Sequence, residues 1–90
     1  MLKKYEEGIK NFDKGMEIEP TYNTCIRRID AYREWMKLDK AIELCNQALI
    51  EFPDNDIETI EAMIDIYKIM NNENKVKEFK EKLQKLKDSK

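Results

Sequence analysis

The chain has 90 residues, of which 40% are charged and 41% are hydrophobic, and its formal net charge is −2. A chain of this length forms one small domain, and its content of apolar residues excludes an intrinsically disordered protein. The nearly balanced charge gives no general attraction to nucleic acid or to anionic lipid, so we expect neither as a partner. No apolar run approaches the roughly 20 residues that span a bilayer, so no membrane segment is expected.

The residue types that carry most enzyme and metal chemistry are scarce in this sequence. Cys25 and Cys45 do not form a C-x-x-C pair and there is no histidine, so the usual ligand set of a zinc site is missing. Ser89 is the only serine, so the common nucleophile–base pairs cannot form. We therefore expect no catalysis and no cofactor. The first ten residues lack the apolar core of a signal peptide, which favours a reducing cytoplasm.

Apolar residues recur at helical spacing in five stretches, and the first three predict helices over about 2–19, 21–36 and 39–52. A proline follows the first and the third stretch, where it ends the helix. The residues on the inward faces are expected to be Tyr5, Ile9, Phe12 and Met16, then Cys25, Ile26, Ile29, Tyr32 and Met36, then Leu38, Ala41, Ile42, Cys45, Ala48, Leu49 and Phe52.

The remaining two stretches predict helices over about 56–70 and 74–87, separated by the polar turn MNNEN. Asn55 and Glu58 have the spacing of a capping box at the start of the fourth helix. The inward residues are expected to be Ile60, Ile64 and Tyr67, then Val76, Phe79, Leu83 and Leu86. The apolar seam of the fifth helix is narrow and its wet face carries the pairs Glu78/Lys82 and Glu81/Lys85, which is typical of a helix at the outside of a stack.

The sequence repeats itself at a spacing of 33 to 35 residues. A shift of 33 aligns YEEGIKNFDKGMEIEP (5–20) with LDKAIELCNQALIEFP (38–53), and a shift of 35 aligns IDAYRE (29–34) with IDIYKI (64–69). Two such shifts on alternate helices indicate a repeated pair of helices with one residue inserted. A period in the low thirties is typical of a solenoid in which helix pairs stack.

At these positions the chain resembles tetratricopeptide repeats. The family's second helix has a small residue, an aromatic, a second small residue and then a proline, and the matching positions here are Gly8, Phe12, Gly15 and Pro20, then Ala41, Cys45, Ala48 and Pro53, with Cys45 in place of the aromatic. Tyr32 and Tyr67 match the tyrosine of the first helix. The family's Trp, Leu and Gly of that helix are replaced by Cys25, Arg28 and Ile29, and its turn glycine by Met36.

The resemblance implies an all-α fold of antiparallel helix pairs, stacked as a short right-handed α-solenoid over residues 1–90. In this division, 1–20 is the second helix of an incomplete repeat, 21–53 is one complete repeat and 54–88 is a second, drifted repeat. TYNTCI (21–26) and KLDKAIEL (37–44) are also similar to pentatricopeptide repeats, which bind RNA. That alternative requires a first helix about one turn shorter than the stretch from Tyr22 to Leu38.

The resemblance also implies a function, namely a protein–protein interaction scaffold or adaptor. In this family the first helices line a concave surface that binds an extended peptide or a partner helix. The residues carried over to that surface are Asn23, Ile26, Arg27, Asp30, Arg33 and Glu34 from the first complete pair, and Glu58, Glu61, Asp65 and Lys68 from the next. The segment from Glu51 to Asp65 holds six acids and no base, so we expect a basic peptide as partner, unless these charges only solvate the helix.

Gly8 and Gly15, the only glycines, both fall within the first predicted helix, where each costs roughly 1 kcal/mol relative to alanine. They lie seven residues apart and so share a face with Tyr5 and Phe12. In the family this face packs on the first helix of its own pair, which the sequence lacks. We therefore expect an open face. It indicates either a piece of a longer repeat array, or a homo-oligomer in which a second copy packs on this face or exchanges helices with it.

Two further expectations concern buried positions. Trp35 lies near a predicted turn, where it is expected to pack between repeats. Cys25 and Cys45 fall at a similar level of two antiparallel helices and are expected to be small buried apolar residues that could approach each other. Their pairing would require Cα atoms within ~7 Å of each other.

Overall fold

The computed structural model describes residues 2–89, so Met1 and Lys90, the two ends of the expected domain, lie outside the described residues. Within this range the chain forms five α-helices and one turn of 3-10 helix. Their bounds are α1 (Leu2–Ile18), α2 (Tyr22–Glu34), α3 (Leu38–Glu51), η1 (Pro53–Asn55), α4 (Asp56–Ile69) and α5 (Glu73–Ser89). The all-α fold expected from the sequence is confirmed for the described residues.

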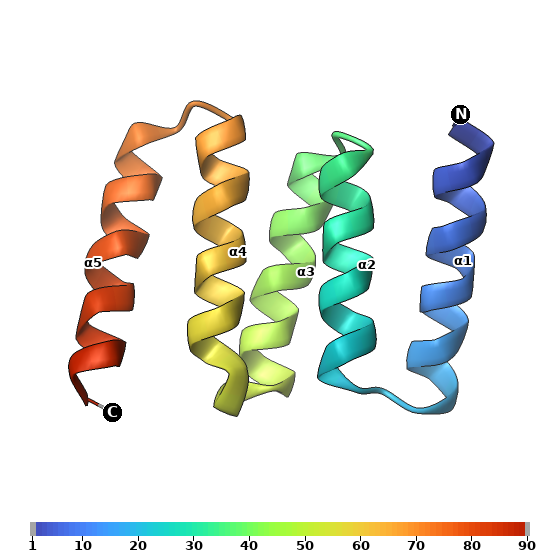
Figure 1. Ribbon diagram of the computed structural model, residues 1–90, viewed down its shortest axis with the longest axis horizontal. Helices are drawn as coiled ribbons and strands as arrows, with labels where there is room; N and C mark the ends of the chain where they lie inside the picture. Colours follow the sequence, from blue (N-terminus) through green and yellow to red (C-terminus); the bar gives the residue numbers. More distant parts are fainter. Residues whose placement is uncertain (1, 90) are drawn as a thin grey trace.

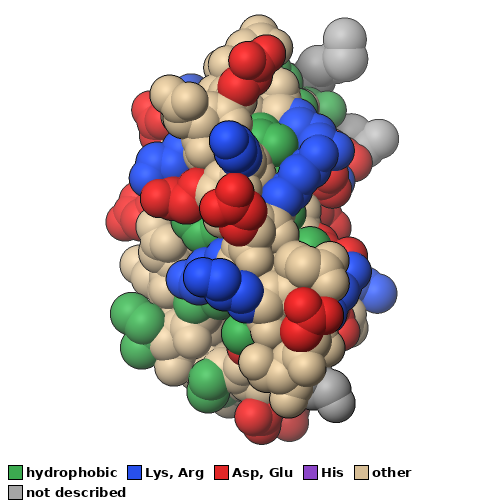
Figure 2. Space-filling view, turned by 90° about the vertical axis from the view of Figure 1, so that its left-hand side faces the viewer, with side chains coloured by type: hydrophobic (Ala, Val, Ile, Leu, Met, Phe, Trp, Pro, Cys, Tyr) green, Lys and Arg blue, Asp and Glu red, His purple; other side chains and the backbone are tan. Residues whose placement is uncertain are grey.

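Consecutive helices run in opposite directions and pack side by side (Figure 1). The Cα atoms fill a flat body of 39 × 29 × 13 Å, with α1 at one edge and α5 at the other (Figure 1). The expectation that the fifth helix lies at the outside is confirmed, because α5 packs on α4 and none of its side chains is buried. Figure 2 views the molecule from the α5 side and shows basic and acidic side chains interspersed, so the α5 lysines form no uninterrupted basic face.

The helix boundaries repeat at the two spacings found in the sequence. The last residues of α1 and α3, Ile18 and Glu51, are 33 residues apart. The last residues of α2 and α4, Glu34 and Ile69, are 35 residues apart, and so are the first residues of α3 and α5. The repeated sequence pattern therefore corresponds to a repeated helix–turn–helix geometry.

The two turns that follow α2 and α4 have the same hydrogen bonds. After α2, the backbone N–H of Lys37 donates to the carbonyl of Tyr32 at 2.9 Å and that of Met36 donates to Arg33 at 3.0 Å. After α4, Asn72 donates to Tyr67 at 3.0 Å and Asn71 to Lys68 at 3.1 Å. Both sets form a Schellman motif, which places Met36 at φ 61° and Asn71 at φ 59°, in the left-handed region.

The hydrophobic core lies between α2, α3 and α4. Its largest fully buried side chains include Ile29, Ile60, Met63 and Ile66, and the expected inward residues Cys25, Ala41, Cys45, Ala48, Ile64 and Tyr67 are buried as well. The α5 seam of Val76, Phe79, Leu83 and Leu86 is half-buried, and Phe79 stacks on Tyr67 with ring centroids 5.5 Å apart. Because the apolar period defined these faces, most of the core could be located from sequence.

A buried hydrogen-bond chain ties the start of α2 to α4. Thr59 is fully buried, and its hydroxyl donates to the carbonyl of Asn55 at 2.9 Å. The Tyr22 hydroxyl lies 3.0 Å from the same Thr59 oxygen. Since the Thr59 proton already serves Asn55, Tyr22 is the donor in this second bond. Burial raises the pKa of the Tyr22 hydroxyl above its usual value, which keeps it protonated.

Three expectations about local structure are wrong. Met36 does not belong to the inward stripe of α2, because that helix ends at Glu34 and the Met36 side chain is 62% exposed. Asn55 does not cap α4 with its side chain, since it belongs to η1 and the Asp56 carboxylate accepts from the Ile57 N–H instead. The pairs Glu78/Lys82 and Glu81/Lys85 do not form. Within the described residues, Glu78 pairs with Lys75 at 3.3 Å instead.

Candidate interaction surface

The residues carried over to the first helices lie on α2 and α4, and one ion pair joins the two rows. The Arg33 guanidinium lies 4.0 Å from the Asp65 carboxylate on α4 and 3.4 Å from Asp30 on its own helix. These three side chains are the members of the expected set that make ion pairs with one another. The ion pair joins α2 to α4 at one point, although 32 residues separate Arg33 from Asp65 and both helices pack on α3.

The other candidate residues differ in their exposure. Ile26, Asp30 and Arg33 are half-buried, whereas the exposed members are Asn23, Arg27, Glu34, Glu58, Glu61, Asp65 and Lys68. Among residues 5–89, whose side chains the structure describes, no basic group lies within 4.0 Å of the carboxylates of Glu58 and Glu61. The α4 half of this surface therefore presents free carboxylates to solvent.

The face of α1 that was expected to be open is partly covered by α2. Tyr5 stacks on Trp35 with ring centroids 6.3 Å apart, and a Cβ at Gly15 would lie 3.4 Å from the Thr24 methyl group. The expectation that nothing from this chain lies against Tyr5 and Gly15 is therefore wrong. A Cβ at Gly8 would meet no atom within 4 Å, so Gly8 does border open space. Phe12 is half-buried.

An aromatic cluster and an ion pair hold α1 against α2. Trp35 stacks on both Tyr5 and Tyr32, and the Lys37 ammonium lies 5.1 Å from the centre of its ring. Trp35 thus packs between elements, in agreement with the sequence expectation. Near the other end, Arg28 donates to the Asp13 carboxylate at 3.1 Å.

Arg28 explains one departure from the family pattern. The 35-residue shift aligns it with Met63, which is fully buried in the core, whereas the Arg28 side chain stays 16% exposed and reaches Asp13 on α1. The charge therefore serves the α1–α2 contact, at a position where the next repeat has a core residue. The Arg28 Nε is buried and has no hydrogen-bond partner within the described part of the chain.

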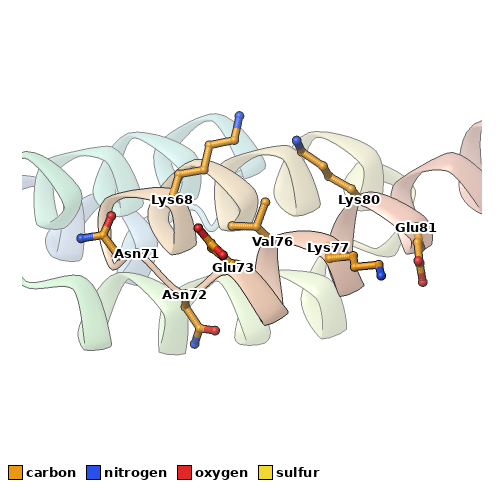
Figure 3. Close-up of a pocket in the computed structure, with 8 residues that line it drawn as sticks. All are labelled: Lys68, Asn71, Asn72, Glu73, Val76, Lys77, Lys80 and Glu81. Carbon is orange, nitrogen blue, oxygen red and sulfur yellow. The ribbon is translucent and has the colours of Figure 1, made fainter.

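Sequence reasoning missed a groove between α4 and α5. Two hollows of about 470 and 270 Å³ share Lys68 and Lys80, and their apolar lining includes Ile64, Val76 and Leu83. Figure 3 shows the larger hollow at the α4–α5 turn. The sequence signal that could have located the groove is the 35-residue shift that aligns α5 with α3. This shift places Lys80 of α5 at the position of Cys45 in α3.

The two cysteines are buried free thiols in the core. Burial raises the pKa of the Cys45 thiol to about 12, and the neighbouring Cys25 adds to this shift; burial also raises the pKa of Cys25. Neither thiol is therefore activated as a nucleophile. Across residues 2–89, no group of three or more His, Cys, Asp or Glu side chains is arranged to hold a metal ion. No helix in this range is long and apolar enough to cross a membrane.

Comparisons with protein-family models, with curated proteins and with solved structures returned no match for this chain. The tetratricopeptide resemblance therefore stays an interpretation of the sequence pattern.

Proposed function

We propose that the chain is a protein-interaction module of the tetratricopeptide type, with α2 and α4 as first helices of successive pairs in a right-handed solenoid. The observation that supports this most is the Arg33–Asp65 ion pair, because it links a residue of α2 to a residue of α4 within the expected surface. The repeated turns at Met36 and Asn71 give the pairs the same internal geometry. The module acts by binding, without catalysis, and its buried thiols suit a reducing cytoplasm.

The ligand is an extended peptide or helix with basic residues that lies across α2 and α4. Glu58 and Glu61 are exposed carboxylates without a basic partner within the described chain. Asp65 lies at the limit of ion-pair distance from Arg33, which also pairs with Asp30. Complementary charge of this kind speeds association and selects partners, and it acts most strongly at low salt. Arg27 and Asn23 on α2 supply polar contacts for the peptide backbone.

The proposal is tested by selecting peptides from a displayed random library and measuring their affinity for variants. We expect enrichment of basic peptides and a loss of about tenfold in affinity for the double variant Glu61→Lys, Asp65→Lys, with a larger effect at low salt. The matched control is Glu6→Lys, Glu7→Lys, which makes the same charge change on the exposed face of α1. Equal losses in both variants would show that only net charge matters and would reject the α2–α4 surface.

Self-association through α1 is a second candidate, favoured by the open space beside Gly8. A helix of a second copy can approach the α1 backbone there without a clash. Light scattering at micromolar concentration gives the mass of the particle directly. A dimer that Gly8→Leu converts to a monomer supports this candidate, whereas a monomeric wild-type chain rejects it.

A further inference from the structure

Arg33 lies between two carboxylates of the α2–α4 surface. Its Nη2 atom lies 3.4 Å from the Asp30 carboxylate on the same helix, and its Nη1 atom lies 4.0 Å from the Asp65 carboxylate on α4. The Arg33 side chain is 28% exposed, whereas those of Asp30 and Asp65 are 46% and 59% exposed. The guanidinium therefore lies deeper than the two carboxylates, which both remain accessible from solvent.

Two carboxylates on different helices form a site that suits a guanidinium group. The planar fork of arginine presents its terminal nitrogens in a fixed geometry, so that one side chain can contact two acceptors at once. The lysine ammonium is a single point charge on a flexible stem and lacks this geometry. Because Arg33 contacts Asp30 through one nitrogen and Asp65 through the other, these two carboxylates form an arginine subsite that the chain fills with its own side chain.

The ion pair with Asp65 is weak enough for Arg33 to be exchanged. At 4.0 Å it lies at the limit of ion-pair distance, and both side chains are in contact with solvent. Ion pairs of this kind contribute little to stability, because water and salt screen them. A guanidinium brought by a ligand can therefore compete with Arg33 while the helices stay packed through their apolar faces.

We propose that Arg33 occupies, in the free chain, the place of an arginine of the ligand, and that the two guanidinium groups exchange when a basic peptide binds. This inference rests on the proposed function, because it takes the α2–α4 surface as the binding site. It adds that the ligand carries arginine rather than lysine next to Asp30 and Asp65, and that Arg33 lowers the affinity by competing for these carboxylates. Glu58 and Glu61, for which residues 5–89 provide no basic partner, hold the other basic residues of the ligand.

Two blocked peptides of equal charge, Ac-GRGGRG-NH2 and Ac-GKGGKG-NH2, serve as probes. Their basic residues are three positions apart, or about 10 Å in an extended chain, which is about the length of α4 from Glu58 to Asp65. Amide NMR titrations of the full chain at low salt give both dissociation constants. We expect the arginine peptide to bind about threefold more tightly than the lysine peptide, because only arginine fits the fork geometry of the subsite.

The decisive variant is Arg33→Gln, which leaves both carboxylates without their internal partner. It should bind the arginine peptide about threefold to fivefold more tightly than the wild-type chain does, and gain less with the lysine peptide. In an Asp65→Asn background the same substitution should gain less than about twofold, because one of the two carboxylates is already neutral. The matched control is Lys10→Gln, which removes one positive charge from the exposed face of α1, at the edge of the molecule (Figure 1). It should change the affinity less than about 1.5-fold.

A milder variant separates competition from a role in the fold. Arg33→Lys keeps the charge and the apolar stem of the side chain and loses only the fork. Its affinity for the arginine peptide should lie between those of the wild-type chain and Arg33→Gln. Urea unfolding followed by circular dichroism checks that each variant is folded under the conditions of the titration.

Several results would overturn the proposal. Equal or weaker binding of the arginine peptide to Arg33→Gln would mean that Arg33 does not compete for Asp65. An equal gain in Lys10→Gln, or an undiminished gain in the Asp65→Asn background, would assign the effect to net charge. Equal affinity for the two peptides would reject the arginine subsite.

The outcomes also distinguish this inference from the proposed function. Weaker binding to Glu61→Lys, Asp65→Lys without a gain in Arg33→Gln would keep the α2–α4 surface and reject only the exchange of arginines. Absence of binding of either peptide to the wild-type chain and to Arg33→Gln would reject both. Binding that appears only in Arg33→Gln would support the exchange, with Arg33 blocking the subsite in the free chain.

Discussion

The turn after α2 gives a sharp stability prediction because Met36 occupies a left-handed conformation at φ 61°. Such a conformation costs a side-chain-bearing residue about 1–2 kcal/mol, whereas glycine adopts it freely. Glycine also gives up about 0.4–1 kcal/mol through the greater entropy of the unfolded chain. Met36→Gly should therefore be about 0.5–1 kcal/mol more stable than Met36→Ala, a comparison in which both variants lack the Met36 side chain.

Met70 provides the matched control, because it precedes Asn71 in the equivalent turn but has a right-handed conformation at φ −75°. There glycine gains no conformational relief, so Met70→Gly should be less stable than Met70→Ala by about 0.5–1 kcal/mol. Urea unfolding followed by circular dichroism gives all four free energies of unfolding, and 1 kcal/mol corresponds to a change in Tm of roughly 4–8 °C for a domain of this size. The same sign of the glycine–alanine difference at both positions would refute the assigned turn geometry.

Further predictions concern α1, the α2–α4 hydrogen bond and the thiols. Gly8→Ala should raise the free energy of unfolding by about 1 kcal/mol, because the added Cβ meets open space. Gly15→Ala should raise it less, because the added Cβ lies 3.4 Å from a side chain. Equal gains of the two variants in urea unfolding would contradict this difference. Tyr22→Phe should cost about 1 kcal/mol, since the buried Thr59 oxygen loses its donor, and unchanged stability would show that this bond is replaced. In the folded chain the pKa of Cys45 is about 12, above its ordinary value of 9.0, so the protonated thiol stabilises the fold fully below pH 9. As the pH rises from 9 toward 12, the free energy of unfolding should fall by at most about 1.4 kcal/mol per pH unit. Cys45→Ala should make this decline shallower, and an identical decline in the variant would assign it to other groups.

The repeat period and the apolar pattern predicted most of the fold. The expected helices end within two residues of the observed ones, because Pro20, Pro53 and the asparagine-rich turn restrict the backbone locally. The pattern failed at Met36, where an apolar residue continued the stripe of α2 beyond the Schellman turn. It also failed at Asn55, which is the last residue of η1 and makes no side-chain hydrogen bond at the start of α4. Both failures lie where hydrogen bonds between backbone groups, rather than side-chain hydrophobicity, determine the conformation.

The candidate surface was predicted less completely. Carrying the family pattern over placed Arg33 and Asp65 in one set, but their contact depends on the distance between two helices that do not follow each other in the chain. The stacking of Tyr5 on Trp35 was missed because it depends on the angle at which α1 lies against α2. The groove between α4 and α5 was missed because a sequence pattern describes which residues pack, whereas the exposure of Lys80 at a packing position is seen only when burial is compared between repeats.

The central claim is that corresponding faces of α2 and α4 form one peptide-binding surface. Its most direct test is an amide NMR shift map of the ¹⁵N-labelled chain during titration with a selected basic peptide. We expect the shifts to concentrate on Asn23, Arg27, Glu58 and Glu61 and to shrink in the Glu61→Lys, Asp65→Lys variant. Shifts confined to α1 or α5, or a map that is the same in the wild-type chain and in this variant, would contradict it.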